Sequence, residues 1–282
     1  MKRNTLFNIA IASAAGVAII AAGCARSSES AKSSAKSDVK STSLQSELLS
    51  VSATYPGYNG QDSCALTLAV DIDYPTQIGT ADIAPLQSAI KDVVFDDLSP
   101  RSIEQLMDSF VTATDSYELN INPEVTGKPA GLDLIYAYER TMSLQRTAID
   151  TKMVTYRLTD DQYIGGAHNM TYTRSFTYAI AEKEVLGLEN LFVPDSMDIV
   201  FAAVNESLAA QYGVAKGELQ QAGFFQNAVG VPNILSIENG AIVFHYNPYD
   251  VAPYSMGEIN AYVYPITIES ALTPMAKKLL ME

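Results

Sequence analysis

The stretch YIGGAHNMTYTR, residues Tyr163–Arg174, leads from a pair of glycines into a regularly alternating run. Alternation with a period of two predicts a β-strand with two different faces. Gly165 and Gly166 indicate a sharp turn or a close approach of the backbone before that strand. We therefore interpret GGAH as a fold signature in which His168 packs or hydrogen-bonds, rather than as a catalytic or metal-binding site.

The alternation continues to Ile180 and separates the side chains of the predicted strand into two sets. One face carries Tyr172, Arg174, Phe176 and Tyr178, and the other carries Thr171, Thr173, Ser175 and Thr177. Further on, apolar residues at helical spacing predict a helix over residues 193–213 that ends at Gly213. Asn239 and Gly240 between two apolar runs predict a tight hairpin, because both central residues of a type I′ turn need positive φ.

The first half of the chain shows a similar order of elements. Residues 64–75 alternate as a half-buried strand, and residues 83–95 have a helical period. A second helix is expected after Ser99 as its cap and Pro100 at its first position. Strands with few helices and no regular βαβ alternation favour an α+β fold with antiparallel sheets. We expect two modules, residues 46–162 and 163–282, each a sheet with helices packed on one face.

The N-terminus has the features of an export signal. Lys2 and Arg3 precede an apolar run, and small residues then lead to Cys24. This pattern resembles the lipobox of bacterial lipoproteins, which implies a signal peptide over residues 1–23 and a lipid attached to Cys24. An uncleaved transmembrane anchor is the alternative, since a span needs about 20 apolar residues. Residues 24–45 are rich in serine, lysine and alanine and predict a flexible tether.

The charge and composition limit the class of partner. The chain has a net charge of −14, and its first 45 residues carry six basic and two acidic side chains, which leaves −18 for residues 46–282. Such a body should repel nucleic acid and is able to steer cationic partners, although acidic surfaces often serve solubility alone. Cys64 is the only cysteine in the body, so an internal disulfide is excluded.

Motifs for established chemistry are absent from the sequence. His168, His245 and Cys64 lie far apart in the chain, so they do not form a metal motif. His245 alternates with Val243 in a predicted strand, which indicates a structural role. The chain also lacks a nucleophile elbow, an EF-hand loop and glycine-rich phosphate loops. We therefore predict no metal, no cofactor and no catalytic residue.

One irregular stretch has the composition of a recognition surface. Residues 245–257 combine prolines with tyrosines, which offer a large amphipathic area at low entropic cost. The predicted binding residues are Tyr246, Tyr249, Asp250 and Tyr254. The alternative is that these rings cover the end of a sheet and that their hydroxyl groups cap the backbone.

Taken together, GGAH with its threonine–tyrosine strand, LGLENLF and IVFHYNPYDVAPYSMG resemble a family of bacterial envelope domains of largely unknown function. Members include the extracellular part of the RsiV-type anti-sigma factor, which senses lysozyme, and the non-catalytic region of a peptidoglycan deacetylase. The resemblance is most specific from about residue 165 to 268. It implies an α+β fold, an envelope location and a binding role, and it supports GGAH as a fold signature.

These observations predict a lipid-anchored protein of the cell envelope, periplasmic or in the outer membrane, held to the membrane through Cys24. Its body is expected to bind another macromolecule, with lysozyme or another cationic envelope protein as the partner. One alternative is an enzyme or accessory protein that acts on cell-wall glycan through His168 or a carboxylate. The other is a purely structural lipoprotein.

Overall fold

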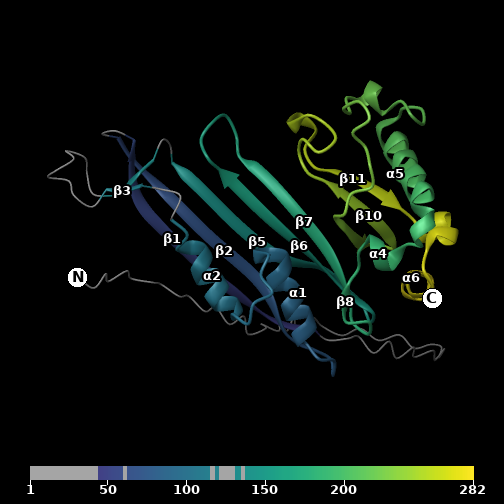
Figure 1. Ribbon diagram of the computed structural model, residues 1–282, viewed down its shortest axis with the longest axis horizontal. Helices are drawn as coiled ribbons and strands as arrows, with labels where there is room; N and C mark the ends of the chain where they lie inside the picture. Colours follow the sequence, from purple (N-terminus) through teal and green to yellow (C-terminus); the bar gives the residue numbers. More distant parts are fainter. Residues whose placement is uncertain (1–43, 60–61, 115–117, 121–130, 135–136) are drawn as a thin grey trace, which may run out of the picture.

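The computed structural model describes residues 44–59, 62–114, 118–120, 131–134 and 137–282. They form an elongated α+β molecule, with a long curled sheet at one end and a smaller sheet surrounded by helices at the other (Figure 1). The predicted fold class is confirmed. The predicted signal peptide, Cys24 and most of the predicted tether lie outside the described residues.

Eight strands form the large sheet, in the order β3-β4-β1-β2-β5-β6-β7-β8. They are β1 (Leu44–Asn59), β2 (Asp62–Ile78), β3 (Glu118–Asn120), β4 (Gly131–Asp133), β5 (Tyr138–Ile149), β6 (Met153–Tyr163), β7 (Met170–Ala179) and β8 (Glu184–Val185). Neighbouring strands are antiparallel except in the pairs β1–β4 and β2–β5. Because β7 pairs with β6, the sheet continues across residue 163, where the boundary between modules was expected.

The long strand β1 was missed by the sequence analysis. Leu44 and Gln45, assigned there to the tether, are its first residues and pair with the end of β2. The signal was present as an alternation in which Leu49, Val51 and Ala53 belong to the core side. Serine and threonine between them weakened the apolar pattern.

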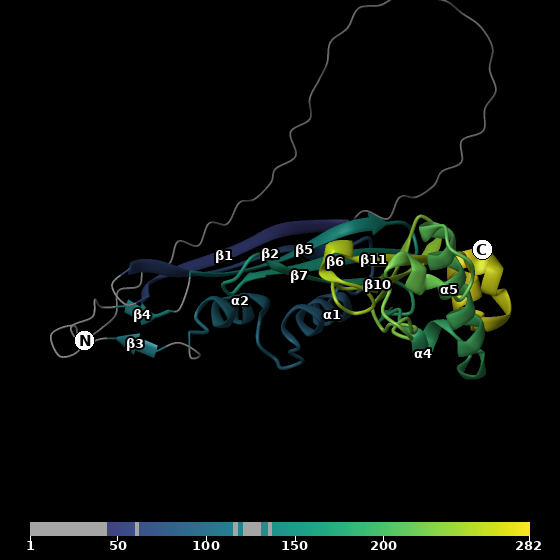
Figure 2. The ribbon, with the colours of Figure 1, turned by 90° about the horizontal axis from the view of Figure 1, so that it is seen from above.

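Two helices, α1 (Ala84–Phe95) and α2 (Ile103–Val111), cover one face of the large sheet (Figure 2). In the described part of the chain, the other face is uncovered along most of its length. Leu86 and Ile90 of α1 are fully buried against the strands. The predicted start of α2 at Ser99 and Pro100 is wrong. The Ser102 hydroxyl instead accepts a hydrogen bond from the Gln105 backbone N–H.

The side chain of Gln105 accepts a hydrogen bond from the Ser102 N–H in return. This reciprocal capping box satisfies two backbone donors at once and starts the helix later than predicted.

The small sheet has the order β11-β10-β9 and is antiparallel, with strands β9 (Leu235–Glu238), β10 (Ala241–Tyr246) and β11 (Ile259–Val263). Asn239 and Gly240 join β9 to β10 with φ values of 50° and 77°, which confirms the predicted two-residue hairpin. Around this sheet lie α4 (Leu188–Leu191), η1 (Pro194–Ser196), α5 (Met197–Tyr212), η2 (Leu219–Ala222), η3 (Tyr254–Met256), η4 (Pro265–Ala271) and α6 (Pro274–Met281).

The helix α5 supplies the main cover of the small sheet. Val200, Val204 and Leu208 are fully buried on its inner face, as their spacing predicted. Gly213 ends α5 with a φ of 67°, which confirms the predicted glycine stop. None of the helices in the described ranges has the length and apolar character needed to cross a membrane.

The buried apolar residues form two separate cores. The first lies between the large sheet and helices α1 and α2, and its last fully buried member in chain order is Tyr178. The second lies around the small sheet and starts at Leu186, with Met153 and Ala179 as its only buried members from the large sheet. The division between the cores therefore falls near residues 179–186.

Candidate binding surface

Two segments far apart in the sequence meet at one end of β7. The first is the GGAH turn between β6 and β7, in which Gly165 and Gly166 have φ values of 87° and 110°. The second is the tyrosine–proline loop that follows β10. The ring of His168 stacks on that of Tyr254, with centroids 3.8 Å apart and planes inclined by 13°.

We call His168, Tyr249 and Tyr254 the aromatic cluster. Tyr249 lies 5.8 Å from Tyr254, centroid to centroid, and is 52% exposed. The Tyr254 hydroxyl donates a hydrogen bond to the Asn169 carbonyl at 2.8 Å, which ties the two loops together. The cluster thus presents aromatic surface to solvent on a fixed support.

The backbone of Tyr249 is strained. Its φ of 73° lies in the left-handed region, which a bulky side chain rarely adopts. Such a conformation costs about 1–2 kcal/mol in a residue with a Cβ atom. Because strained residues concentrate at functional sites, this observation favours a role for the exposed ring.

The other two predicted binding residues have different surroundings. Tyr246 is buried in the core instead of lying on the surface, and its hydroxyl donates a hydrogen bond to the Gly230 carbonyl at 2.5 Å. Burial raises the pKa of its phenol. Asp250 is exposed, and its carboxylate accepts a hydrogen bond from the Asn247 N–H at 2.7 Å, which shapes the loop. Tyr246 and Tyr254 thus cap backbone carbonyls, as the alternative interpretation expected.

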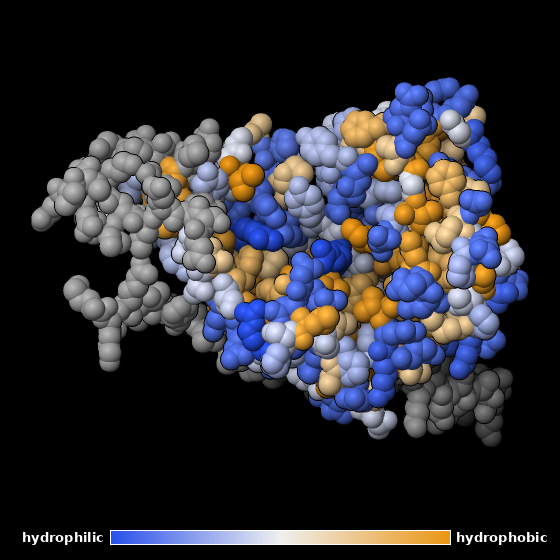
Figure 3. Space-filling model, viewed as in Figure 1, coloured by the Kyte–Doolittle hydropathy of each residue, from blue (hydrophilic) through white to orange (hydrophobic). Residues whose placement is uncertain are grey.

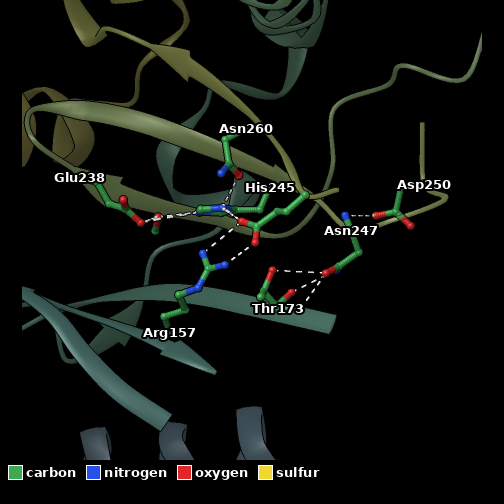
Figure 4. A network of polar contacts seen from close by, with 9 residues as sticks. Arg157, Thr173, Glu238, His245, Asn247, Asp250 and Asn260 are labelled. Carbon is green, nitrogen blue, oxygen red and sulfur yellow. Dashed lines mark hydrogen bonds and ion pairs between the residues drawn. The ribbon is translucent and has the colours of Figure 1, made fainter. Parts of the chain in front are cut away.

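His245 lies buried between the two sheets, at the centre of a polar network (Figure 4). Its Nε2 is 2.8 Å from the Ser236 Oγ, and its Nδ1 is 2.7 Å from the Asn260 Oδ1. The Ser236 hydroxyl also donates a hydrogen bond to Glu238 at 2.7 Å. Every polar atom of the imidazole therefore has a partner.

An ion pair connects this network to the large sheet. Arg157 of β6 contacts both carboxylate oxygens of Glu258, which lies directly before β11. Burial alone would raise the pKa of Glu258, but hydrogen bonds from His245 and Arg157 lower it to about 2. Glu258 therefore stays ionised and joins the two sheets at neutral pH.

The threonine face of β7 is part of the same junction, together with Thr155 of β6. Thr155 and Thr177 are buried, and their hydroxyl groups lie 2.8 Å apart. Thr155 donates to the Ile237 carbonyl at 3.0 Å, and Thr177 accepts from the Ile237 N–H at 2.8 Å. Two threonines thus satisfy the edge of β9. Sequence reasoning missed this contact because hydroxyl residues on an alternating strand usually face water.

Ser236 and His245 have the spacing of a nucleophile and its base, yet neither is accessible. Their exposed fractions are 0% and 1%. A substrate carbonyl needs to reach the nucleophile, so this pair is a structural contact in the present conformation. Among the residues that the structure describes, no three His, Cys, Asp or Glu side chains gather as metal ligands would.

An apolar groove of about 610 Å³ lies between α5 and β11, away from the predicted residues. Ala203, Tyr262 and Ile268 contribute to its lining, together with the acidic Asp198 and Glu206. Figure 3 shows apolar patches over the α5 side of the molecule, interrupted by polar residues. This groove contains none of the residues that the sequence singled out.

Comparisons with known proteins match part of this region. Residues 189–263 match the family model described as protein of unknown function (DUF3298), a segment that includes the small sheet, His245, Tyr249 and Tyr254. The expected resemblance is confirmed at this level, as a family of unknown function, and the closer likeness to the anti-sigma factor stays a prediction.

Two solved structures share the fold. A DUF3298 family member from Bacteroides fragilis has a TM-score of 0.66 at 18% identity and covers 86% of this chain and 100% of its own. A DUF3298 family protein from Pseudomonas aeruginosa has a TM-score of 0.53 at 17% identity, covering 82% and 95%. A protein named esterase Rv3036c from Mycobacterium tuberculosis is 27% identical over 121 residues, or 41% of this chain. The matched region is about half of that relative's length, 48%.

Proposed function

We propose that this chain is a lipid-anchored protein of the bacterial cell envelope whose body binds another macromolecule through the aromatic cluster. The partner we propose is a cationic envelope-active protein, with lysozyme as the example to test. The anchor is a lipid on Cys24, in a periplasmic or outer-membrane location. The single observation that carries the binding role is the stacking of His168 on Tyr254 beside the exposed, strained Tyr249.

The charge of the protein supports the choice of a cationic partner. A body of net charge −18 attracts a basic protein over long range and accelerates its association. Aromatic rings on a rigid support then supply contact area with little loss of side-chain entropy. In this proposal the negative charge of the body accelerates the encounter with a basic protein, and the aromatic cluster determines which protein is bound.

The anchor is tested in bacterial cells that express the full chain with a C-terminal tag. A clickable fatty acid should label the wild-type protein and not Cys24→Ala. Cys64→Ala is the matched control and should keep the label. An unlabelled wild-type chain that stays in the membrane fraction would favour the uncleaved apolar anchor instead.

Binding is tested by calorimetric titration of the full chain with lysozyme at low and high salt. Tyr249→Ala and Tyr254→Ala should each weaken binding by roughly tenfold, as truncated aromatic residues at interface centres do. Tyr262→Ala removes another exposed tyrosine, on β11, and should leave the affinity unchanged. If all three variants bind alike, or if high salt abolishes binding, the aromatic cluster is not the recognition site.

Ester hydrolysis is the second candidate, favoured by the name of the mycobacterial relative and by the 2.8 Å contact of Ser236 with His245. It requires the two sheets to part, because Ser236 is inaccessible. Turnover of p-nitrophenyl acetate that Ser236→Ala abolishes, in a variant that stays folded, would replace the binding proposal. Turnover equal in both proteins would be non-specific.

A further inference from the structure

In the described part of the chain, side chains bond backbone groups on three strand edges. The side-chain amide of Asn247 bonds both backbone groups of Thr173 on the outer edge of β7. On β11, the N–H of Tyr262 donates to the Ser207 hydroxyl of α5 at 2.9 Å. With the threonines that satisfy β9, each of these edges offers fewer free backbone groups to another chain.

The outer edge of β1 is different. Its neighbour β4 pairs only with Gly57 and Tyr58, so no described strand lies beside residues 44–54 on that side. Within the described part of the chain, no side chain bonds the outward backbone groups of these residues either. We call residues 44–54 of β1 the free edge. It extends over roughly 35 Å at the usual rise of a strand.

The free edge has little of the usual protection against strand addition: its pairing with β2 has one irregularity, between Gln45 and Ser46, and is regular from Ser46 to Thr54. Natural edge strands are kept short or carry lysine, proline or bulges. β3 and β8, at the two ends of the large sheet, have 3 and 2 residues. In contrast, the sequence LQSELLSVSAT at the free edge contains no lysine, arginine or proline. This edge therefore has the form of a template for strand addition.

Acidic side chains flank the free edge on both faces of the sheet. Asp71 and Asp73 of β2 pair in register with Ser50 and Leu48, on the face without helices. Glu47 lies toward the helices, where it raises the pKa of Tyr74, after the larger effect of burial and together with Glu104. Among the described residues, these three carboxylates have no ion-pair partner.

We propose that the free edge of β1 binds an extended cationic segment of another protein as an added β-strand. The backbone of residues 44–54 would supply the hydrogen bonds, and lysine or arginine on alternate positions of the added strand would lie on the face of Asp71 and Asp73. A cation at an intervening position would approach Glu47 on the other face. A second copy of this chain fits less well, because two bodies of charge −18 repel each other. The site is separate from the aromatic cluster and does not depend on it.

The test uses the full chain and a peptide of alternating lysine and threonine as the probe. Hydrogen exchange should show that the amides of the free edge that face away from β2 exchange quickly in the protein alone and become protected when the peptide binds. The same peptide with an N-methyl group on every residue keeps its charge but has no N–H to donate on either edge, so it should give no protection. Equal protection by both peptides would overturn strand addition.

Matched variants locate the site. Leu48→Lys places a cation beside the edge at a residue that is 48% exposed. Leu98→Lys adds the same charge at a residue that is 74% exposed, in the loop between α1 and α2. We expect Leu48→Lys to weaken peptide binding by about threefold to tenfold, and Leu98→Lys to have a smaller effect. The double variant Asp71→Asn with Asp73→Asn should weaken binding to a similar extent.

Two outcomes would contradict the proposal directly. One is equal affinity of Leu48→Lys and Leu98→Lys for the peptide. The other is slow exchange, without any peptide, of the free-edge amides that face away from β2. If that protection grew with protein concentration, the occupant would be a second copy of the chain, and if it did not, the edge would be covered within the chain itself.

Discussion

The side-chain amide of Asn247 pairs with the backbone of Thr173 as a neighbouring strand would. Its oxygen accepts a hydrogen bond from the Thr173 N–H at 2.7 Å, and its nitrogen donates to the Thr173 carbonyl at 3.1 Å. One side chain from the loop after β10 thereby closes the edge of β7 and fixes the tyrosine–proline loop to the large sheet. These two hydrogen bonds hold the N-terminal end of the tyrosine–proline loop in place.

Asn247→Ala is expected to destabilise the protein. The buried Thr173 would lose the partner of its backbone N–H, which costs about 1–3 kcal/mol. Urea unfolding measures this loss of unfolding free energy. Asn205→Ala removes an asparagine whose side chain bonds only the Phe201 carbonyl of its own helix, so it should change the unfolding free energy by less than about 0.5 kcal/mol.

Glu258 should make the stability depend on acidity. Its pKa is lowered from 4.5 to about 2 in the folded protein, so its stabilising contribution is complete above pH 4.5 and is lost as the pH falls toward 2. Because the carboxylate is partly exposed to solvent, we expect about 1–2 kcal/mol.

Unfolding of the wild type and of Glu258→Gln across this pH range measures the contribution. The variant should be less stable at pH 7, and the two curves should converge near pH 2. Glu269→Gln removes an exposed carboxylate that lies 3.8 Å from Lys277, and it should differ little from the wild type at any pH. A constant difference between wild type and Glu258→Gln would show that its charge is not the cause.

Tyr249→Gly should stabilise the fold relative to Tyr249→Ala. Glycine adopts the φ of 73° without the penalty that a Cβ atom brings, whereas alanine keeps that penalty. We expect the glycine variant to exceed the alanine variant by about 1 kcal/mol in unfolding free energy. Both variants should lose binding equally, so stability and binding would separate. An alanine variant as stable as the glycine variant would show that the backbone is unstrained.

Local signals in the sequence predicted much of the small sheet. Asn239 with Gly240 and the stop at Gly213 act through their own backbone preferences, so each is visible in a few letters. The start of α2 was misplaced because Ser99 and Ser102 are both acceptable caps. Gln105 identifies Ser102 as the cap, because it is the third residue after Ser102 and completes the capping box.

The site depends on contacts between distant segments, which no local pattern encodes. His168 and Tyr254 were predicted separately, one as part of a fold signature and one as a binding residue. Their stacking depends on the packing of the small sheet against β7. Likewise, the threonines of β7 have the polar character of a solvent-exposed face. Their burial is evident only once β9 is known to pack against them.

The division of the two cores has a consequence for the order of folding. The large-sheet core ends with Tyr178, so the first 185 residues contain nearly all the apolar surface that it needs. Thr155 and Thr177, which satisfy β9, also lie in this part. During synthesis, which proceeds from the N-terminus, the chain can therefore form the large sheet first. The remaining residues can then fold against that sheet. Residues after 185 therefore fold against a large sheet that is already formed, whereas the large sheet forms without them.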